Sequence, residues 1–425
     1  MRIIGGNKNF DVTANLVGSK SESNRALMIA YYGGFTPRIK NLSTSDDTKL
    51  LKEILDSLQS PTNPTNPTNP ITSRIINCYN SGTVLRFLLT ALSVGPWRAA
   101  SCILTGSERM QQRPIGDLVD ALREIGADIR YMGEDGFPPV EIHPVETCHG
   151  ASMHNTISVD ITKSSQFASS LLLAMPSLIG MRRATTLHLD GDLSSLPYID
   201  MTIAVMQKFG AKIHRDDRDI VLQPSDYQDV EYCVESDWTC ASYWYEAVAL
   251  SENGHARLKN LHLDSKQGDA VVAKWFEKFG VKSVQDGVDV VITRVKPLSG
   301  VSHDDMDYSF DFINNPDLYP TIAATCAGLG VEGHFKGLRN LKHKESDRVA
   351  AMTTELVKTH GRASQSSVQT CHGASLPIFD SHDDHRIAMA LAPLAMKIGA
   401  IEINDADVVS KSYPNFWEEF TPILK

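Results

Sequence analysis

Residues 115–144 read IGDLVDALREIGADIRYMGEDGFPPVEIHP, and this stretch decides the fold. Its apolar side chains recur at the three- and four-residue spacing of a helix as far as Gly126, where a residue that tolerates positive φ can close the helix. Two short apolar runs separated by a turn follow. The stretch therefore predicts a helix that ends at a glycine and is followed by two strands joined by a turn.

The same pattern returns further along the chain. The copies are IDMTIAVMQKFGAKIHRDDRDIVLQP at 199–224, GDAVVAKWFEKFGVKSVQDGVDVVITR at 268–294 and SDRVAAMTTELVKTHGRAS at 346–364. Their helices are expected to close at Gly210, Gly280 and Gly361, and a degraded copy without a closing glycine fits residues 45–60. The copies lie too far apart for a solenoid, so we expect compact α+β units within an α/β fold.

Length and composition restrict the class of protein. The chain has 425 residues, which suggests two or three domains, and its 41 Lys and Arg against 51 Asp and Glu give a net charge of −10. This charge argues against a general nucleic-acid or anionic-membrane surface, so an anion site must be a local basic cluster. The segment PTNPTNPTNP predicts an exposed low-complexity loop at residues 60–71.

The compartment follows from cysteine usage and from the absence of long apolar runs. The seven cysteines form no C-x-x-C pair, which favours reduced thiols over a disulfide framework or a zinc site. The start, MRIIGGNKNF, lacks the pattern of a secretory signal, and no apolar run reaches the length of a membrane span. We expect a cytoplasmic protein that binds neither membrane nor nucleic acid and contains no metal.

Four polar clusters stand immediately before apolar helical runs. They are GSKSESNR at 18–25, NSGT at 80–83, KSSQ at 163–166 and DDHR at 383–386. The unpaired N–H groups and the positive dipole end of a helix start can hold an anion, and four such starts predict a polyanionic ligand. Ordinary N-capping by Ser, Thr, Asn or Asp is the alternative. Lys20 and Arg25 favour the anion interpretation, because capping needs neither cation.

Two acidic residues are candidates for proton transfer. In RNLKHKESDR, residues 339–348, Glu345 lies within one helical turn of Lys344 and Arg348. This arrangement fits either a surface salt bridge or a carboxyl whose proton affinity is tuned for acid–base work. Asp317 stands at the head of the apolar helix in INNPDLYPTIAATCAG, where a first-turn aspartate is the simpler interpretation.

Seven motifs together resemble one known family. They are GSKSESNRAL (18–27), NSGTVLR (80–86), GSERMQQRPIGDLVDAL (106–122), SSQFASSLLLAMP (164–176), DLSSLPYIDMT (192–202), KHKESDRVAAM (342–352) and DDHRIAMALAP (383–393). In this order they resemble the EPSP synthases, the 3-phosphoshikimate 1-carboxyvinyltransferases of aromatic amino-acid biosynthesis, from about residue 5 to 420. One departure is Tyr79, which stands before Asn80 where the family usually has glycine.

The resemblance implies a fold and a domain division. It implies two similar domains, each of three βαβαββ units in an inside-out barrel-like arrangement, with the active site in the cleft between them. The first domain would comprise residues 1–18 and 237–425, and the second residues 19–236.

The resemblance also implies a reaction and its ligands. The enolpyruvyl group of phosphoenolpyruvate would pass to the 5-hydroxyl of shikimate 3-phosphate through a tetrahedral intermediate, with release of phosphate. The partners are these two small molecules, no metal or organic cofactor is implied, and we expect a monomer. Asp317 would accept the hydroxyl proton, and Glu345 would protonate the methylene carbon of phosphoenolpyruvate.

Residue by residue, the resemblance assigns two sets of contacts. The shikimate 3-phosphate set is Lys20, Ser21, Arg25, Ser164, Ser165, Gln166, Ser195, Tyr198, Asp317, Asn340 and Lys344. The phosphoenolpyruvate set is Lys20, Gly82, Arg113, Gln166, Arg348, Arg386 and Lys411. At Gly82 a side chain would crowd the small substrate.

Two other functions are compatible with the same residues. An enolpyruvyl transferase acting on a UDP-amino sugar would be similar in fold, but that sister family presents a loop cysteine and residues 105–114 contain none. A noncatalytic binder of phosphorylated sugars or RNA ends could use the same cations. The acids Asp317 and Glu345 argue against such a binder.

Overall fold

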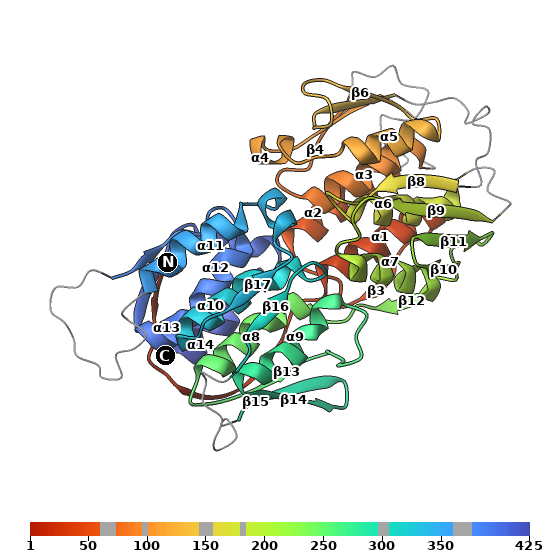
Figure 1. The fold of residues 1–425 in the computed structure, drawn as a ribbon. Coiled ribbons are helices and arrows are strands. Elements are labelled where there is room, and N and C mark those ends of the chain that lie inside the picture. Colours follow the sequence, from red (N-terminus) through yellow and green to blue (C-terminus); the bar gives the residue numbers. More distant parts are fainter. Residues whose placement is uncertain (60–73, 96–100, 144–155, 179–183, 296–305, 360–375) are drawn as a thin grey trace. The chain divides into compact units, whose positions relative to one another are not determined.

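The computed structural model describes residues 1–59, 74–95, 101–143, 156–178, 184–295, 306–359 and 376–425 (Figure 1). The loop expected at 60–71 and the expected closing glycine Gly361 lie outside these residues. The chain divides into two compact units. Unit 1 comprises Met1–Ser19, Thr44–Asp46 and Glu235–Lys425, and unit 2 comprises Lys20–Ser43 and Asp47–Val234. The return of Thr44–Asp46 to unit 1 is a detail that the sequence did not predict.

Unit 2 contains three sheets among its described residues. The first has the order β4 (Arg74–Asn77), β5 (Cys102–Thr105), β7 (Val140–His143), β6 (Asp128–Tyr131). The second has the order β8 (Thr156–Asp160), β9 (Thr185–Asp190), β11 (Asp219–Gln223), β10 (Lys212–Asp216). The third pairs β3 (Arg38–Lys40) with β12 (Glu231–Cys233) in parallel. The helices are α1 (Lys20–Gly33), α2 (Asp46–Gln59), α3 (Gly82–Val94), α4 (Glu108–Gln111), α5 (Gly116–Glu124), α6 (Gln166–Ala174) and α7 (Leu196–Lys208).

Unit 1 also contains three sheets among its described residues. The first has the order β2 (Asn9–Ala14), β13 (Asn253–Leu258), β15 (Asp289–Arg294), β14 (Val281–Asp286). The others are β16 (Ser309–Asp311) with β17 (His334–Lys336), and β18 (Ile378–Phe379) with β19 (Ala400–Ile403) and β1 (Arg2–Ile4). The helices are α8 (Trp238–Leu250), α9 (Val272–Trp275), α10 (Tyr319–Leu329), α11 (Arg348–Leu356), α12 (His385–Leu391), α13 (Ala395–Ile398) and α14 (Phe416–Leu424).

The three four-stranded sheets share one topology. In each, the first two strands are parallel, one helix precedes the second strand and another follows it. A closing hairpin then places its last strand beside the second strand, as when β7 pairs with both β5 and β6. In the sheet of unit 1, the whole of unit 2 lies in the chain between β2 and the helix α8. The hairpins predicted after Gly126, Gly210 and Gly280 are present, and these glycines have φ of +97°, +91° and +73°. The predicted α/β fold class is confirmed, because this order of elements is βαβαββ.

One predicted helix is broken. Residues 268–279 were expected to form a continuous amphipathic helix, but the backbone forms a 3₁₀ turn at Gly268–Val271, the four-residue α9, and a second 3₁₀ turn at Phe276–Phe279. The β-branched and aromatic residues of this segment have weak helix propensity. Burial of Phe276 and Phe279 in the core of unit 1 therefore decides the backbone there.

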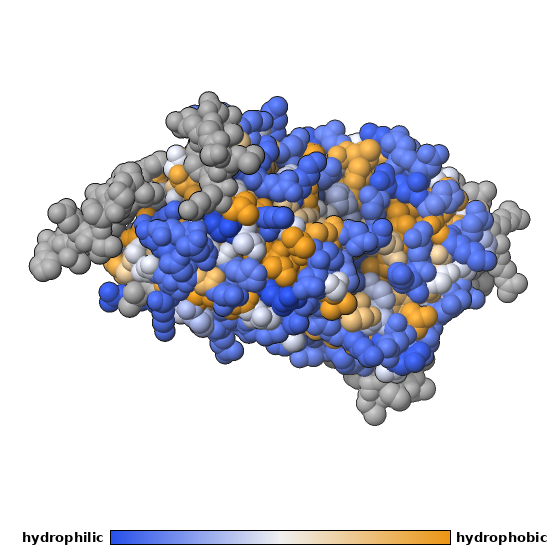
Figure 2. Space-filling model, turned by 90° about the horizontal axis from the view of Figure 1, so that it is seen from below, coloured by the Kyte–Doolittle hydropathy of each residue, from blue (hydrophilic) through white to orange (hydrophobic). Residues whose placement is uncertain are grey.

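Each unit has its own hydrophobic core. All thirteen residues of α8 are buried, so this helix runs through the interior of unit 1. Burial of one large apolar side chain contributes about 1.5–3 kcal/mol, and α8 alone buries Trp238, Trp244 and Tyr245. On the face in Figure 2, hydrophilic residues cover most of the surface and hydrophobic ones form scattered patches. None of the described helices has the length and apolar character that a membrane span needs.

The interior of α8 contains one unusual group, the carboxyl of Glu246. The residue is fully buried, and no described residue donates a hydrogen bond to either of its oxygens. Burial raises the pKa of Glu246 well above its usual value of 4.5, because the low-dielectric core disfavours the charged form. The folded protein therefore holds this carboxyl protonated at pH values where the unfolded chain releases the proton.

This difference predicts a loss of stability as the pH rises. From pH 4.5 up to the folded pKa, the Glu246 term lowers the free energy of unfolding by about 1.4 kcal/mol per pH unit. Glu246→Gln keeps the shape and removes the titration. It is expected to melt at a higher temperature than the wild type at pH 8 and at a similar temperature near pH 4.5. Glu332→Gln, at an exposed position of unit 1, is the matched control. A parallel pH dependence in wild type and Glu246→Gln would contradict the assignment.

Candidate functional site

In unit 2, the start of α1 carries the two predicted cations. The Lys20 ammonium lies 3.2 Å from a carboxylate oxygen of Asp47. The Arg25 guanidinium is buried and donates hydrogen bonds to the Thr202 and Ser169 hydroxyls and to the carbonyls of Ser21 and Tyr198. All four acceptors are neutral. Burial lowers the pKa of Arg25 to about 10, although Tyr198 and Glu22 oppose this effect. A buried cation with neutral hydrogen-bond acceptors favours a nearby anion, and Glu22 of the same helix is one such group.

A serine hydroxyl caps the start of each of the helices α3 and α6. At α3, the Ser81 hydroxyl accepts from the Val84 N–H. At α6, the Ser165 side chain makes no cap hydrogen bond, but the Ser164 hydroxyl accepts from the Gln166 N–H at 3.2 Å. The capping interpretation is therefore confirmed at both helix starts.

The Gln166 side chain links the two helix starts. Its carbonyl oxygen accepts from the Arg86 guanidinium at 2.6 Å, and its amide nitrogen donates to the Thr83 hydroxyl at 2.9 Å. Arg86 also donates to the Pro114 carbonyl and lies over the Phe167 ring, 5.3 Å from its centroid. The amide therefore has a fixed orientation at the starts of α3 and α6.

Gly82 lies directly against the guanidinium of Arg113. A Cβ atom at position 82 would stand 2.7 Å from the Arg113 Cζ and Nη2 atoms, closer than side chains approach one another. Arg113 is itself buried and donates to the Asn80 carbonyl. A side chain at position 82 would therefore have to displace Arg113 before it could crowd a substrate.

The resemblance implies that Arg113 binds phosphoenolpyruvate. Gly82→Ala is therefore expected to raise the KM for phosphoenolpyruvate by about tenfold, because a displaced guanidinium no longer orients an anion. The KM for shikimate 3-phosphate should change less, and steady-state kinetics with each substrate varied would measure both. Gly133→Ala is the control, because a Cβ at Gly133 meets no atom within 4 Å. An unchanged KM for phosphoenolpyruvate in Gly82→Ala would contradict the role of the Gly82–Arg113 contact.

In unit 1, Asp317 is bound by three cations. It lies in the 3₁₀ turn Pro316–Leu318, immediately before α10. One carboxylate oxygen accepts from Arg348 at 2.7 Å and lies 3.4 Å from the Lys344 ammonium, and the other accepts from Arg386 at 2.8 Å. Asp317 is therefore the centre of an ion-pair cluster, not merely a first-turn residue of a helix.

Arg348 joins three carboxylates of the same unit. Besides Asp317 it donates to Glu345 at 3.0 Å and to Asp384 at 2.8 Å, and its side chain is 1% exposed. The other Glu345 oxygen lies 3.1 Å from the Lys411 ammonium. Asp384 is the N-cap of α12 and also accepts from the Arg386 N–H. The predicted proximity of Glu345 and Arg348 is confirmed, but the pair is buried and is not a surface salt bridge.

This packing of charges shifts several pKa values. Burial alone would raise the pKa of Asp317, but Arg386, Lys344 and Arg348 outweigh it and hold that pKa well below the usual range. Burial lowers the pKa of Lys344, although Asp317 opposes this effect. Asp317 is therefore firmly ionised in this arrangement, and a carboxylate this well stabilised is a weak base.

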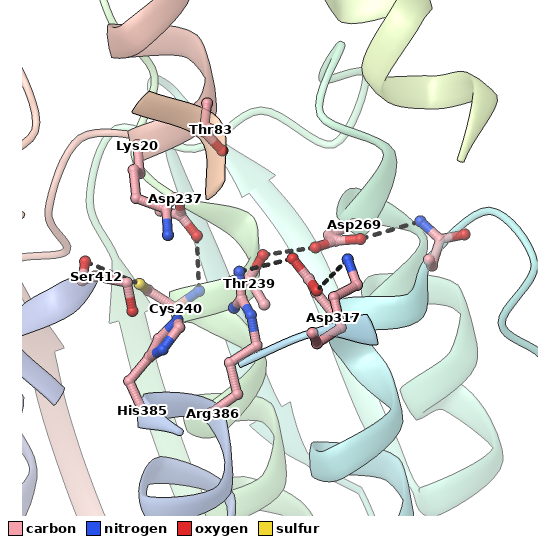
Figure 3. A network of polar contacts seen from close by, with 12 residues as sticks. Lys20, Thr83, Asp237, Thr239, Cys240, Asp269, Asp317, His385, Arg386 and Ser412 are labelled. Carbon is pink, nitrogen blue, oxygen red and sulfur yellow. Dashed lines mark hydrogen bonds and ion pairs between the residues drawn. The ribbon is translucent and has the colours of Figure 1, made fainter. Parts of the chain in front are cut away.

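A second carboxyl, Asp269, lies close to this cluster (Figure 3). It accepts from the Thr239 hydroxyl at 2.5 Å and from the Asn315 amide at 3.1 Å. Burial and the charge of Asp317 raise the pKa of Asp269 to about 6. Asn315 precedes the turn that carries Asp317, so Asp269 ties this turn to the start of α8.

The two predicted contact sets divide between the units. Unit 2 carries Lys20, Ser21, Arg25, Gly82, Arg113, Ser164, Ser165, Gln166, Ser195 and Tyr198, and unit 1 carries Asp317, Asn340, Lys344, Glu345, Arg348, Arg386 and Lys411. In unit 1, the structure brings Lys344, Glu345, Arg386 and Lys411 together around Asp317 and Arg348, and Asn340 lies in the 3₁₀ turn Arg339–His343. Ser195 begins α7 with φ +55°.

Sequence reasoning missed several residues that hold these side chains. They are Asp47, Arg86, Ser169 and Thr202 in unit 2, and Thr239, Asp269, Asn315 and Asp384 in unit 1. Asp384 belongs to the polar cluster DDHR, and Arg86, Ser169 and Thr202 lie in three of the motifs that carry the family resemblance. The others become partners through tertiary contacts.

Two further predictions bear on chemistry. No group of three or more His, Cys, Asp or Glu residues suited to a metal ion occurs among the described residues. Cys102 is buried in β5, and burial raises the pKa of its thiol to about 11, so it is not a loop nucleophile. Residues 105–114, where the sister family presents its cysteine, include the short helix α4.

The family match decides the classification. The chain matches the profile of EPSP synthase (3-phosphoshikimate 1-carboxyvinyltransferase) over residues 5–420. The chain belongs to the EPSP synthase family. Curated family members named 3-phosphoshikimate 1-carboxyvinyltransferase are similar over nearly the whole length. The protein of Bacteroides fragilis strain YCH46 is 36% identical over 417 residues, covering 96% of this chain and 94% of its own, and that of Shewanella woodyi is 34% identical over 435 residues, covering 97% and 96%.

Solved structures of the same fold agree. The EPSP synthase of Acinetobacter baumannii superposes with a TM-score of 0.70 at 21% identity, covering 99% of this chain and 97% of that one. The enolpyruvyl transferase NikO of Streptomyces tendae gives a TM-score of 0.65 at 15% identity, covering 99% and 96%. At these identities the likeness concerns the fold.

Proposed function

We propose that this chain transfers the enolpyruvyl group of phosphoenolpyruvate to the 5-hydroxyl of shikimate 3-phosphate, giving 5-enolpyruvylshikimate 3-phosphate and phosphate. One observation carries the proposal within the EPSP synthase family. Asp317 and Glu345, the two acids needed for proton transfer, share the guanidinium of Arg348, and Lys344, Arg386 and Lys411 bind the same two carboxylates. A noncatalytic binder would need the cations but not the acids.

Electrostatics explains how two anions can be held together. Both substrates carry phosphate and carboxylate groups, and fixed cations offset their repulsion. Shikimate 3-phosphate is proposed to contact Lys20, Ser21, Arg25, Ser164, Ser165, Gln166, Ser195, Tyr198, Asp317, Asn340 and Lys344. Phosphoenolpyruvate is proposed to contact Lys20, Gly82, Arg113, Gln166, Arg348, Arg386 and Lys411.

The proton steps need one base and one acid. Asp317 accepts the 5-hydroxyl proton as that oxygen forms a bond to C2 of phosphoenolpyruvate, and Glu345 donates a proton to C3, which becomes a methyl group. The resulting tetrahedral intermediate then loses phosphate, which takes the proton held by Asp317, and a methyl proton returns to Glu345 as the enol double bond is restored. Both carboxyl groups thus end in their starting protonation states, and no oxidant or reductant takes part.

The ion-pair cluster suggests how the base is activated. While Lys344, Arg348 and Arg386 all bind Asp317, its proton affinity is low. Substrate phosphate and carboxylate groups compete for the same three cations, and each cation they engage binds Asp317 less strongly. The pKa of Asp317 then rises towards the range of a useful base only when the substrates are bound.

A phosphate-release assay tests the proposed function. Phosphoenolpyruvate is supplied alone, with shikimate 3-phosphate, or with a UDP-amino sugar, and free phosphate is measured over time. We expect release only with shikimate 3-phosphate. Release with the UDP-amino sugar would indicate the sister activity, and saturable substrate binding without release would indicate a binding protein.

Location and assembly complete the proposal. The described cysteines Cys78, Cys102, Cys233, Cys240 and Cys326 are free thiols, which supports a reducing, cytoplasmic location. The expected monomer stays a prediction that light scattering can test.

A further inference from the structure

The segment between β18 and α12 holds two consecutive residues in a left-handed conformation. His382 has φ +52° and Asp383 has φ +53°, and neither is glycine. L-amino acids are strained in this region, and such strain persists only where surrounding contacts enforce it. The strained pair stands immediately before Asp384, His385 and Arg386, the start of α12. The contacts that enforce it therefore decide where Arg386 is placed.

Helix α11 forms hydrogen bonds to this segment on both sides of the His382–Asp383 pair. At the start of α11, Arg348 donates two hydrogen bonds to Asp384, at 2.8 and 3.3 Å. At its other end, Glu355 accepts from the Asp380 N–H at 2.9 Å and from the His382 ring at 3.0 Å. The two ends of α11 thus hold the segment before and after the His382–Asp383 turn. We call the contacts that Arg348 and Glu355 make with this segment the clamp.

At the Glu355 end of this clamp, a buried carboxylate has several partners. Glu355 is 1% exposed, and its carboxylate also pairs with Lys358 at 2.6 Å. The Asp380 side chain closes the loop further by accepting from the His382 N–H. Glu355 touches none of the groups assigned to the substrates, so any effect it has on the reaction must pass through the backbone of residues 380–386.

We propose that Glu355 is a positioning residue of the enolpyruvyl transfer. By binding Asp380 and His382 it holds the strained His382–Asp383 turn, and this turn sets Arg386 against Asp317 and the phosphoenolpyruvate that Arg386 is proposed to bind. The inference rests on the proposed function. It adds to that function a residue with a specific consequence, because loss of the clamp should affect phosphoenolpyruvate more than shikimate 3-phosphate.

The test removes the clamp and then relieves the strain. Glu355→Ala is expected to raise the KM for phosphoenolpyruvate by about tenfold and to lower kcat, with less than a twofold change in the KM for shikimate 3-phosphate. Asp383→Gly alone should be near wild type, since Asp383 makes no clamp contact and glycine adopts positive φ freely. In the double variant, the glycine should recover a large part of the lost kcat/KM.

Two further variants distinguish a local effect of the clamp from a general loss of folding. His382 is half-buried, so His382→Asn breaks the contact with Glu355 without changing a buried residue. It should raise the KM for phosphoenolpyruvate less than Glu355→Ala does. Lys358→Gln is the control, because it removes the bonds that Lys358 donates to Glu355 and to the Ile378 carbonyl but leaves the contacts of Glu355 with Asp380 and His382. Melting temperatures of all variants report global stability.

The outcomes separate the clamp from the proposed function. Equal changes in both KM values, an equal loss in Lys358→Gln, or no recovery on adding Asp383→Gly would overturn the positioning role. If the wild type releases no phosphate from phosphoenolpyruvate and shikimate 3-phosphate, the proposed function fails. Amide hydrogen exchange over residues 380–386 then still tests the clamp, since Glu355→Ala should speed exchange there and Lys358→Gln should not.

Discussion

Glu345→Gln is expected to lower kcat by a factor of about 10² to 10⁴, the usual contribution of a positioned proton donor. The substitution keeps the shape of the side chain and one oxygen for Arg348 or Lys411, which Glu345 contacts at 3.0 and 3.1 Å. Substrate binding should therefore persist while protonation of the methylene carbon fails. Steady-state kinetics gives the loss in kcat, and titration calorimetry gives the retained affinity.

Glu252→Gln is the matched control for this variant, because it removes an exposed carboxylate of the same unit that pairs with Lys8 at the surface. Its kcat should equal that of the wild type. A Glu345→Gln enzyme with near-normal turnover would exclude Glu345 as the acid. A loss of binding equal to the loss of kcat would assign it a role in holding substrate instead.

The second large effect is expected in Asp317→Asn, where turnover and anion affinity should move in opposite directions. Without the base, kcat should again fall by a factor of about 10² to 10⁴. The substitution also removes the counter-ion shared by Lys344, Arg348 and Arg386. These cations should then bind inorganic phosphate more tightly than in the wild type, which calorimetry would measure.

Asp264→Asn, at an exposed position of unit 1, is the control and should change neither quantity. Wild-type turnover in Asp317→Asn would exclude the residue as the base. Weaker phosphate binding in Asp317→Asn would refute the proposal that Asp317 competes with anionic ligands for the cations. The two readouts thus test the proton step and the activation mechanism separately.

The repeating fold could be predicted because its signals are local. The spacing of apolar residues before Gly126 and Gly210, and the hairpins that follow, depend on interactions within a few residues of each other. The same reasoning failed at residues 268–279, where burial of aromatic side chains in the core outweighs helical periodicity. Capping of α3 by Ser81 and of α6 by Ser164 could be predicted for the same reason, but only the backbone geometry decides that Ser164 and not Ser165 makes the bond.

The amino-acid sequence by itself determined the order of the βαβαββ units, the polar helix starts and the set of charged residues. Tertiary structure alone decided that Asp317, Glu345 and Asp384 share Arg348, that Glu246 is buried without a hydrogen-bond partner among the described residues, and that Glu355 holds a strained turn. The physical reason is how far apart in the chain the interacting residues lie. A helix or hairpin forms through neighbours in the chain, whereas an ion pair or a buried charge depends on segments that only packing brings together.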